Sequence, residues 1–138
     1  MTIFAYTDGA SRGNPGESGI GVILKNEDGT TISSLAGYIG KATNNIAEYK
    51  ALIACIALTK KFPCTQLIVH SDSELLVRQL KKVYRIKDKT LRTLSAKVEK
   101  ELSTAPFSFD IRHIDRALNR EADCLANAGI DTRKKIKV

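Results

Sequence analysis

The chain has 138 residues, 43% of them apolar, which is enough for one compact core and too few for two ordinary domains. Lys and Arg number 22 against 15 Asp and Glu, and the net charge of +7 favours a polyanionic partner such as nucleic acid, although a basic solvated surface has the same composition. The three cysteines show no CxxC spacing, so neither a disulfide framework nor a zinc site is indicated.

The N-terminal third predicts an antiparallel meander. Residues 3–6 are apolar and β-rich, and they predict a buried strand that carries Asp8 into a glycine-rich turn, where Gly9, Gly13 and Gly16 supply turn chemistry and close backbone approach. A second strand over 19–25 is followed by a strong hairpin turn at 26–29, and a third strand returns over 31–39. Such a meander needs a helix or a second sheet to cover its apolar face.

The covering helix is predicted to begin at Thr43 or Asn44, either of which can cap it, and to end near residue 61. Residues 66–71 are apolar without alternation, which is typical of a central strand covered on both faces. Asp72 follows this strand directly. It therefore emerges where ligands bind in open α/β sheets.

The second half predicts a short helix over 73–80, a basic connector over 81–89 and a longer helix over 90–102. Clean alternation over 107–113 predicts a strand with one apolar face. Asn119 is then expected to cap a last helix.

Gly129 is a plausible C-cap for this last helix. We therefore divide the chain into a compact domain over 1–130 and a basic tail over 131–138, whose four cations and lack of pattern predict mobility. No basic-then-apolar leader follows Met1, and no apolar run approaches the roughly 18 residues that a membrane span requires. With three unpaired thiols, we expect a soluble monomer in the cytoplasm.

Four acids occupy the boundaries between these elements: Asp8, Glu48, Asp72 and Asp123. Taken singly, each has an ordinary structural explanation. Asp8 begins an Asp-Gly turn, Glu48 and Asp123 are favourable charges in first helical turns, and Asp72 can cap the helix that follows it. No single acid decides the function.

The order of the four segments is more selective than any acid alone. TDGASRGNPG, TNNIAEY, SDSELLVRQL and NREADCLA occur in an order that resembles type 1 ribonuclease H, from residue 3 to about residue 130. The resemblance implies an α/β fold of the ribonuclease H-like kind, with a mixed five-stranded sheet (an antiparallel meander followed by parallel strands) flanked by helices. It also implies an endonuclease that hydrolyses the RNA strand of RNA–DNA hybrids, leaving 5′-phosphate and 3′-hydroxyl ends.

By this resemblance Asp8, Glu48, Asp72 and Asp123 converge and hold metal. Two like charges about 4 Å apart cost roughly 4 kcal/mol at an effective dielectric of 20, so protons or divalent cations must neutralise the cluster. An all-oxygen set favours Mg²⁺ over Zn²⁺, with Mn²⁺ as a substitute. Two ions would activate the attacking water and stabilise the leaving 3′ oxygen. In the family pattern Asp8 bridges both ions, Asp123 holds the ion with the water, and Glu48 with Asp72 holds the other.

Selection of RNA requires contacts to consecutive ribose 2′-hydroxyls in the wide minor groove. Glu74 stands where many relatives have Gln, which changes its capacity to donate hydrogen bonds. Thr43 and Asn44, at a helix start, resemble the pocket that grips a phosphate of the DNA strand. The resemblance implies further substrate contacts at Gly9, Ser11, Arg12, Gly13, Asn14, Asn45 and Glu74.

Longer relatives insert a basic protrusion with tryptophans, whereas this chain has no Trp and only the connector over 81–89. We expect substrate affinity to rest on its cations, with Tyr84 available to pack on a sugar. An ordinary solvated run of charge is the alternative. The connector's cations are Lys81, Lys82, Arg85, Lys87 and Lys89.

His113 lies ten residues before Asp123, where some relatives carry a histidine that assists turnover. Its unperturbed pKa of about 6.5 suits proton transfer or movement of a metal at product release. Because side chains alternate along a strand, His113 is expected on the same face as Phe109 and Ile111. The alternative is therefore that His113 packs at the strand end.

Two other functions compete with the hybrid nuclease. A non-catalytic module that binds hybrids or double-stranded RNA is disfavoured because all four acids are retained. A proofreading-type exonuclease usually has a second acid two residues after the first, and here that position is Ala10. Double-stranded RNA remains a further candidate substrate.

Overall fold

The computed structural model describes residues 1–138. The helices and strands are β1 (Thr2–Arg12), β2 (Gly16–Lys25), β3 (Thr31–Ala42), α1 (Asn44–Thr59), β4 (Gln66–Ser71), α2 (Glu74–Leu80), α3 (Lys89–Ser103), β5 (Ser108–His113), the short 3-10 helix η1 (Arg116–Leu118) and α4 (Arg120–Thr132). No helix has both the length and the apolar character needed to cross a membrane.

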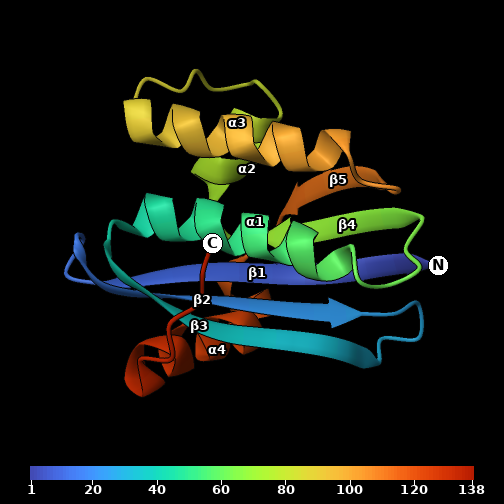
Figure 1. Cartoon of the computed structure of the whole chain (residues 1–138), viewed down its shortest axis with the longest axis horizontal. Coiled ribbons are helices and arrows are strands. Elements are labelled where there is room, and N and C mark those ends of the chain that lie inside the picture. Colours follow the sequence, from blue (N-terminus) through green and yellow to red (C-terminus); the bar gives the residue numbers. More distant parts are fainter.

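One mixed sheet runs through the middle of the molecule in the order β3-β2-β1-β4-β5. The pairs β1–β2 and β2–β3 are antiparallel, and β4 and β5 continue the sheet in parallel with β1. Helix α1 lies on one face with α3 stacked beyond it, and α4 covers β2 and β3 on the opposite face (Figure 1). This confirms the predicted meander followed by parallel strands.

The core lies between the sheet and α1. Apolar residues of β1 and β2, such as Ile3, Val22 and Leu24, are fully buried against Leu52 and Ile56 of α1. Because α3 covers the other side of α1, that helix is buried on most of its surface and carries almost no polar stripe. This burial fixes the start of α1 against the sheet.

Strand β1 is longer than the predicted strand over 3–6. It continues through Gly9 to Arg12, so Asp8 lies inside a paired strand and the turn begins only at Gly13. At Gly9 a Cβ atom would sit 2.3 Å from the backbone carbon of Ala47, so only glycine lets α1 approach β1 this closely. The predicted place of Gly9 in a turn was therefore wrong, whereas the close backbone approach predicted for it is confirmed.

Helix α4 does not end at the predicted C-cap. Gly129 lies within the helix, where a Cβ atom would be 2.3 Å from the carbonyl oxygen of Gly37 in β3. The helix continues to Thr132, and Arg133 follows in the left-handed conformation with φ of 51°. Glycine at 129 therefore permits helix–sheet contact, and the C-cap prediction was wrong.

The C-terminal residues pack on β3, contrary to the expectation of a mobile tail. The Tyr38 N–H donates to the Lys134 carbonyl oxygen at 2.9 Å, and the Ile136 N–H donates to the Tyr38 carbonyl oxygen at 3.1 Å. Ile136 also packs against the core beside Gly37. Eight residues are too few to show a periodic pattern, so the sequence did not predict this contact. The contact also depends on the space that Gly37 leaves in β3.

Deleting Lys134–Val138 should therefore lower the melting temperature by several degrees, because two backbone hydrogen bonds and the burial of Ile136 together contribute about 1–3 kcal/mol. Thermal unfolding without nucleic acid measures the effect. Lys137→Ala, at an exposed position, is the control and should melt with the parent chain. If the truncated chain also melts with the parent and only its affinity for hybrid falls with salt, the tail acts through charge alone.

Candidate active site

Four acidic side chains meet at the end of the sheet where β1 and β4 lie side by side. Asp8 comes from β1, Glu48 from the first turns of α1, Asp72 from the residue after β4, and Asp123 from α4. Carboxylate oxygens of Asp8, Glu48 and Asp72 lie within 4.8 Å of one another. Asp123 lines the same cleft, and its carboxylate acts on Asp8 together with those of Glu48 and Asp72.

The first two acids are held in place by the packing of α1 on β1. Asp8 is 5% exposed and Glu48 is 4% exposed. The Gly9 N–H donates to Glu48 Oε1 at 2.8 Å, across the close contact that this glycine allows. The fold thus fixes the Glu48 carboxylate before any ligand binds.

Burial and mutual repulsion disfavour the charged forms of these acids. Burial, followed by the charges of Glu48 and Asp72, raises the pKa of Asp8 to about 9. Burial and the charge of Asp72 raise the pKa of Glu48 to about 8, although the Gly9 N–H and Arg116 act in the opposite direction. A divalent cation would remove both penalties, and an all-oxygen donor set suits a hard ion. The residues present therefore fit a divalent metal.

Asn119 holds the third acid. Its Nδ2 donates to Asp72 Oδ2 at 3.2 Å and to the Thr7 carbonyl oxygen at 2.8 Å. It makes no side-chain bond to the amides of α4, although its position in the chain is that of the N-cap. The predicted N-cap position is confirmed, but the side chain makes no capping bond and instead joins the start of α4 to β1 and Asp72.

The acids lie at the bottom of an open cleft of about 600 Å³. Arg116, in η1, lines the cleft and places a cation near Glu48. Four residues at the site were not predicted from the sequence: Ser73, Arg116, Asn119 and Asn127. Only Arg116 could have been predicted, because it is a cation between the strand predicted over 107–113 and the helix that carries Asp123. The cleft residues are Asp8, Gly9, Ala10, Ser11, Arg12, Asn14, Asn44, Glu48, Asp72, Ser73, Arg116, Asp123 and Asn127.

Comparison with known proteins identifies the family. The family model described as reverse transcriptase-like matches residues 6–129. A ribonuclease H of Coxiella burnetii is 35% identical over 144 aligned residues, which cover 94% of this chain and 90% of that protein. The chain belongs to the type 1 ribonuclease H family.

Solved structures of ribonuclease H proteins share this fold closely. The crystal structure of RNase H1 from Halobacterium salinarum superposes with a TM-score of 0.91 at 37% identity, covering 96% of this chain and 99% of that one. LC11-RNase H1, solved in complex with an RNA/DNA hybrid, gives a TM-score of 0.89 at 41% identity over 94% and 97% of the two chains. The ribonuclease HI of Halobacterium salinarum is 40% identical over 129 residues, and the chain spans 64% of its length.

Several predicted substrate contacts of this ribonuclease H chain border the carboxylate cleft. Asn14 Oδ1 accepts the Asn44 N–H at 2.9 Å and so connects the turn after Gly13 to the start of α1. Ser11 Oγ donates to the Ala42 carbonyl oxygen, and Arg12 pairs with Asp131 at 2.7 Å. Gly9, Ser11, Arg12, Asn14 and Asn44 all line the cleft.

Thr43 and Asn45 lie on the far side of Asn14, in a separate hollow. Thr43 caps α1, with its Oγ1 accepting the Ile46 N–H at 3.2 Å. The hollow also contains Asp88 and Thr90, which begin α3. The predicted contacts thus form two neighbouring groups, joined by Asn14.

The remaining predicted contacts lie outside both groups: Glu74 in α2, and Tyr84 and Lys87 in the connector. Glu74 pairs with Arg78 at 2.9 Å and accepts the Tyr84 hydroxyl at 3.4 Å, and the Arg78 guanidinium lies 5.3 Å from the Tyr84 ring centroid. Lys87 is exposed in the connector. The structure therefore groups Glu74 with Tyr84, and neither residue lines the carboxylate cleft.

His113 is the last residue of β5 and pairs in register with Ser71, the neighbour of Asp72. Its side chain is exposed, whereas Ile111 on the same strand is buried. The alternative that His113 packs beside Phe109 and Ile111 at the strand end was therefore wrong. It lies near the strand end that carries Asp72 but does not line the cleft.

Proposed function

We propose that the chain is an endonuclease that hydrolyses the RNA strand of RNA–DNA hybrids. The observation that carries this proposal is the convergence of Asp8, Glu48 and Asp72 within 4.8 Å, with Asp123 beside them, in an open cleft. Membership of the ribonuclease H family and the hybrid bound to LC11-RNase H1 support the choice of substrate.

We propose Mg²⁺ as the cofactor, with Mn²⁺ as a substitute, held by Asp8, Glu48, Asp72 and Asp123. Bound ions of this kind acidify water and neutralise the charge that develops on a leaving oxygen during phosphodiester hydrolysis. The chain's own residues prepare the site: the Gly9 N–H fixes Glu48, and Asn119 orients Asp72. Arg116 adds a positive charge facing the position of a substrate phosphate.

We propose that substrate selection depends on the surface that the two groups of contacts form together. Backbone from Gly9 to Gly13, with Asn14 and Asn45, would face consecutive 2′-hydroxyls of the RNA strand. Thr43 and Asn44 at the start of α1 suit a phosphate of the DNA strand, because exposed amides and the helix dipole favour an anion there. Lys87 and Tyr84 would extend the contact along the duplex. We further propose that the protein is a monomer and, since all three cysteines are free, that it is cytoplasmic.

The test is a cleavage assay on labelled RNA–DNA, RNA–RNA and DNA–DNA duplexes of one sequence, each with Mg²⁺ and with a chelator. We expect cleavage of the RNA strand in the hybrid with Mg²⁺ alone. Cleavage of RNA–RNA duplex would add double-stranded RNA to the substrates. Tight binding of hybrid without cleavage in either metal would instead identify a non-catalytic module.

His113→Ala should lower turnover by roughly 10–100-fold, at or below the low end for loss of a general acid or base. Its exposure predicts an unchanged melting temperature, and it is no metal ligand, so affinity for Mg²⁺ should persist. Steady-state kinetics and melting curves on the same variant decide the question. Unchanged turnover would leave the four carboxylates and Arg116 as the reacting site.

A further inference from the structure

The side chain of Asn127 connects α4 to β1 at the carboxylate cleft. Asn127 lies one helical turn after Asp123, and its Nδ2 donates to Asp123 Oδ1 at 3.3 Å and to the Asp123 carbonyl oxygen at 3.1 Å. Its Oδ1 accepts a hydrogen bond from Arg12 Nη2, at the end of β1, at 3.2 Å. One amide therefore contacts an acid of the site on one side and a cation on the other.

These two neighbours fix the orientation of the amide. A flipped amide would turn its oxygen toward the Asp123 carboxylate and its N–H groups toward the Arg12 guanidinium, so both contacts would become repulsive. Arg12 is itself held from the same helix, because its Nη1 donates to Asp131 Oδ1 at 2.7 Å. Asn127 thus presents a donor to Asp123 from a fixed position.

Asp123 is the acid of the site that most needs such a donor. The other three acids form one close group, with carboxylate oxygens within 4.8 Å of one another, and Asp123 is not a member of that group. Its side chain is half-buried, whereas Asp8 and Glu48 are buried. No backbone N–H and no side-chain N–H other than that of Asn127 donates to its carboxylate. Packing alone therefore restrains Asp123 less than its neighbours.

We propose that Asn127 is a positioning residue that holds the Asp123 carboxylate in its metal-binding orientation, and that Arg12 holds Asn127. The proposal rests on the assignment of Asp123 as a metal ligand. The bond from Asn127 uses Oδ1 and leaves Oδ2 without a hydrogen bond, so the carboxylate keeps an oxygen for a cation. Loss of a group that hydrogen-bonds to a metal ligand typically lowers metal affinity or activity by about 10–100-fold.

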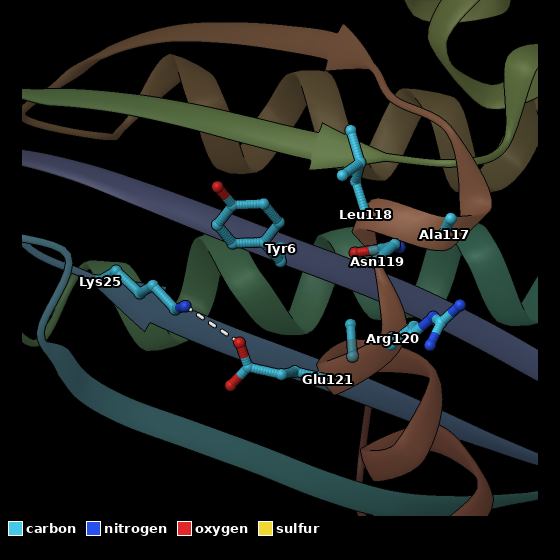
Figure 2. A pocket seen from close by; sticks show the side chains of 8 residues that line it. Tyr6, Lys25, Ala117, Leu118, Asn119, Arg120 and Glu121 are labelled. Atoms are coloured by element: carbon cyan, nitrogen blue, oxygen red, sulfur yellow. Dashed lines mark hydrogen bonds and ion pairs between the residues drawn. The ribbon is translucent and has the colours of Figure 1, made fainter.

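A second ion pair anchors α4 to the sheet without touching Asn127. At the start of the helix, Lys25 of β2 pairs with Glu121 at 3.0 Å, as Figure 2 shows. Arg12 and Lys25 each pair with one carboxylate of α4 from adjacent strands, but only Arg12 contacts the amide that bonds to Asp123. Because loss of either cation changes the net charge equally, Lys25→Gln is the matched control for Arg12→Gln.

The test measures the Asp123 rotamer and the cleavage kinetics of the same variants. Hα–Hβ coupling constants of Asp123 report its χ1 angle in the free protein, without metal or nucleic acid. We expect one rotamer in the parent chain and averaged couplings in Asn127→Ala, with kcat about tenfold lower and KM for the hybrid unchanged. Ala is a better helix former than Asn, so this variant should fold.

Two results would overturn the role of Asn127. The first is a single Asp123 rotamer in Asn127→Ala, and the second is a kcat equal to that of the parent chain. Failure of the proposed function is a separate outcome, because it would appear as a parent chain that does not cleave the hybrid, whereas the coupling constants do not depend on cleavage.

A double-mutant cycle tests the part of Arg12. Arg12→Gln should lower kcat about threefold and should have no further effect in the Asn127→Ala background, because it acts through that amide. Lys25→Gln should keep the kcat of the parent chain. Equal effects of Arg12→Gln in both backgrounds, or a change confined to KM for the hybrid, would show that Arg12 contacts the substrate directly and contradict its positioning role.

Discussion

Replacing Asp8 with Asn is expected to abolish Mg²⁺-dependent cleavage while leaving the fold and hybrid binding intact. Asp8 lies at the centre of the cluster, because it interacts with Glu48, Asp72 and Asp123 together. Metal stabilisation of transition-state charge amounts to several kcal/mol, so its loss should reduce turnover by about 10³-fold or more. Cleavage rates at saturating hybrid, with binding measured separately, give the result.

The same substitution should hold or raise the melting temperature without metal, since a buried amide needs neither the proton nor the counter-charge that the Asp8 carboxyl requires. Asp28→Asn, in the exposed hairpin turn between β2 and β3, is the matched control and should change neither property. Substantial Mg²⁺-dependent cleavage by the Asp8 variant would contradict its assignment as a metal ligand. A large loss of stability would indicate a structural carboxylate.

The metal-free protein should lose stability steadily as the pH rises from about 4 to about 9. Unfolded carboxyl groups ionise near pH 4. In the folded chain the pKa of Asp8 is raised to about 9 and that of Glu48 to about 8. Between those limits the folded state binds more protons than the unfolded state. The contribution of these two acids to the free energy of unfolding is therefore greatest below pH 4 and falls as the pH rises.

Melting temperatures in chelator at a series of pH values measure this slope. Asp8→Asn and Glu48→Gln should each flatten it, and Mg²⁺ should restore stability most strongly at high pH, where a cation replaces the missing protons. The exposed Asp28→Asn variant should keep the slope of the parent chain. A metal-free melting temperature that rises between pH 5 and pH 9 would show that these carboxyls are ionised in the fold.

The sequence predicted the sheet well, because its strands carry local signals. Residues 66–71 lack alternation and form the strand β4, which lies between β1 and β5 and buries three consecutive residues, as that pattern indicates. The hairpin turn before β3 and the capping Thr43 are also local chemistry, and both were predicted. Asp72 emerges at the end of β4 because a parallel strand in an open sheet ends at the ligand-binding edge.

Contacts between distant segments set the features that the sequence did not reveal. Gly129 was interpreted as a C-cap, whereas it permits close packing of α4 on β3. For Gly9 close backbone approach was predicted, but its partner in α1 was not. The same holds for Asn119, whose capping position hid its bonds to Asp72 and Thr7. Local propensity describes the chain's own backbone, and these roles depend on partners at least 38 residues away.

Analysis of the RNA product ends tests the central claim most directly. If water acts as the nucleophile at the four carboxylates with Mg²⁺, the RNA strand of a hybrid should yield 5′-phosphate and 3′-hydroxyl ends, and only when Mg²⁺ or Mn²⁺ is present. Mass spectrometry of the products from the parent chain gives both ends at once. Products with 2′,3′-cyclic phosphates, formed equally in chelator, would show attack by the ribose hydroxyl and contradict the account.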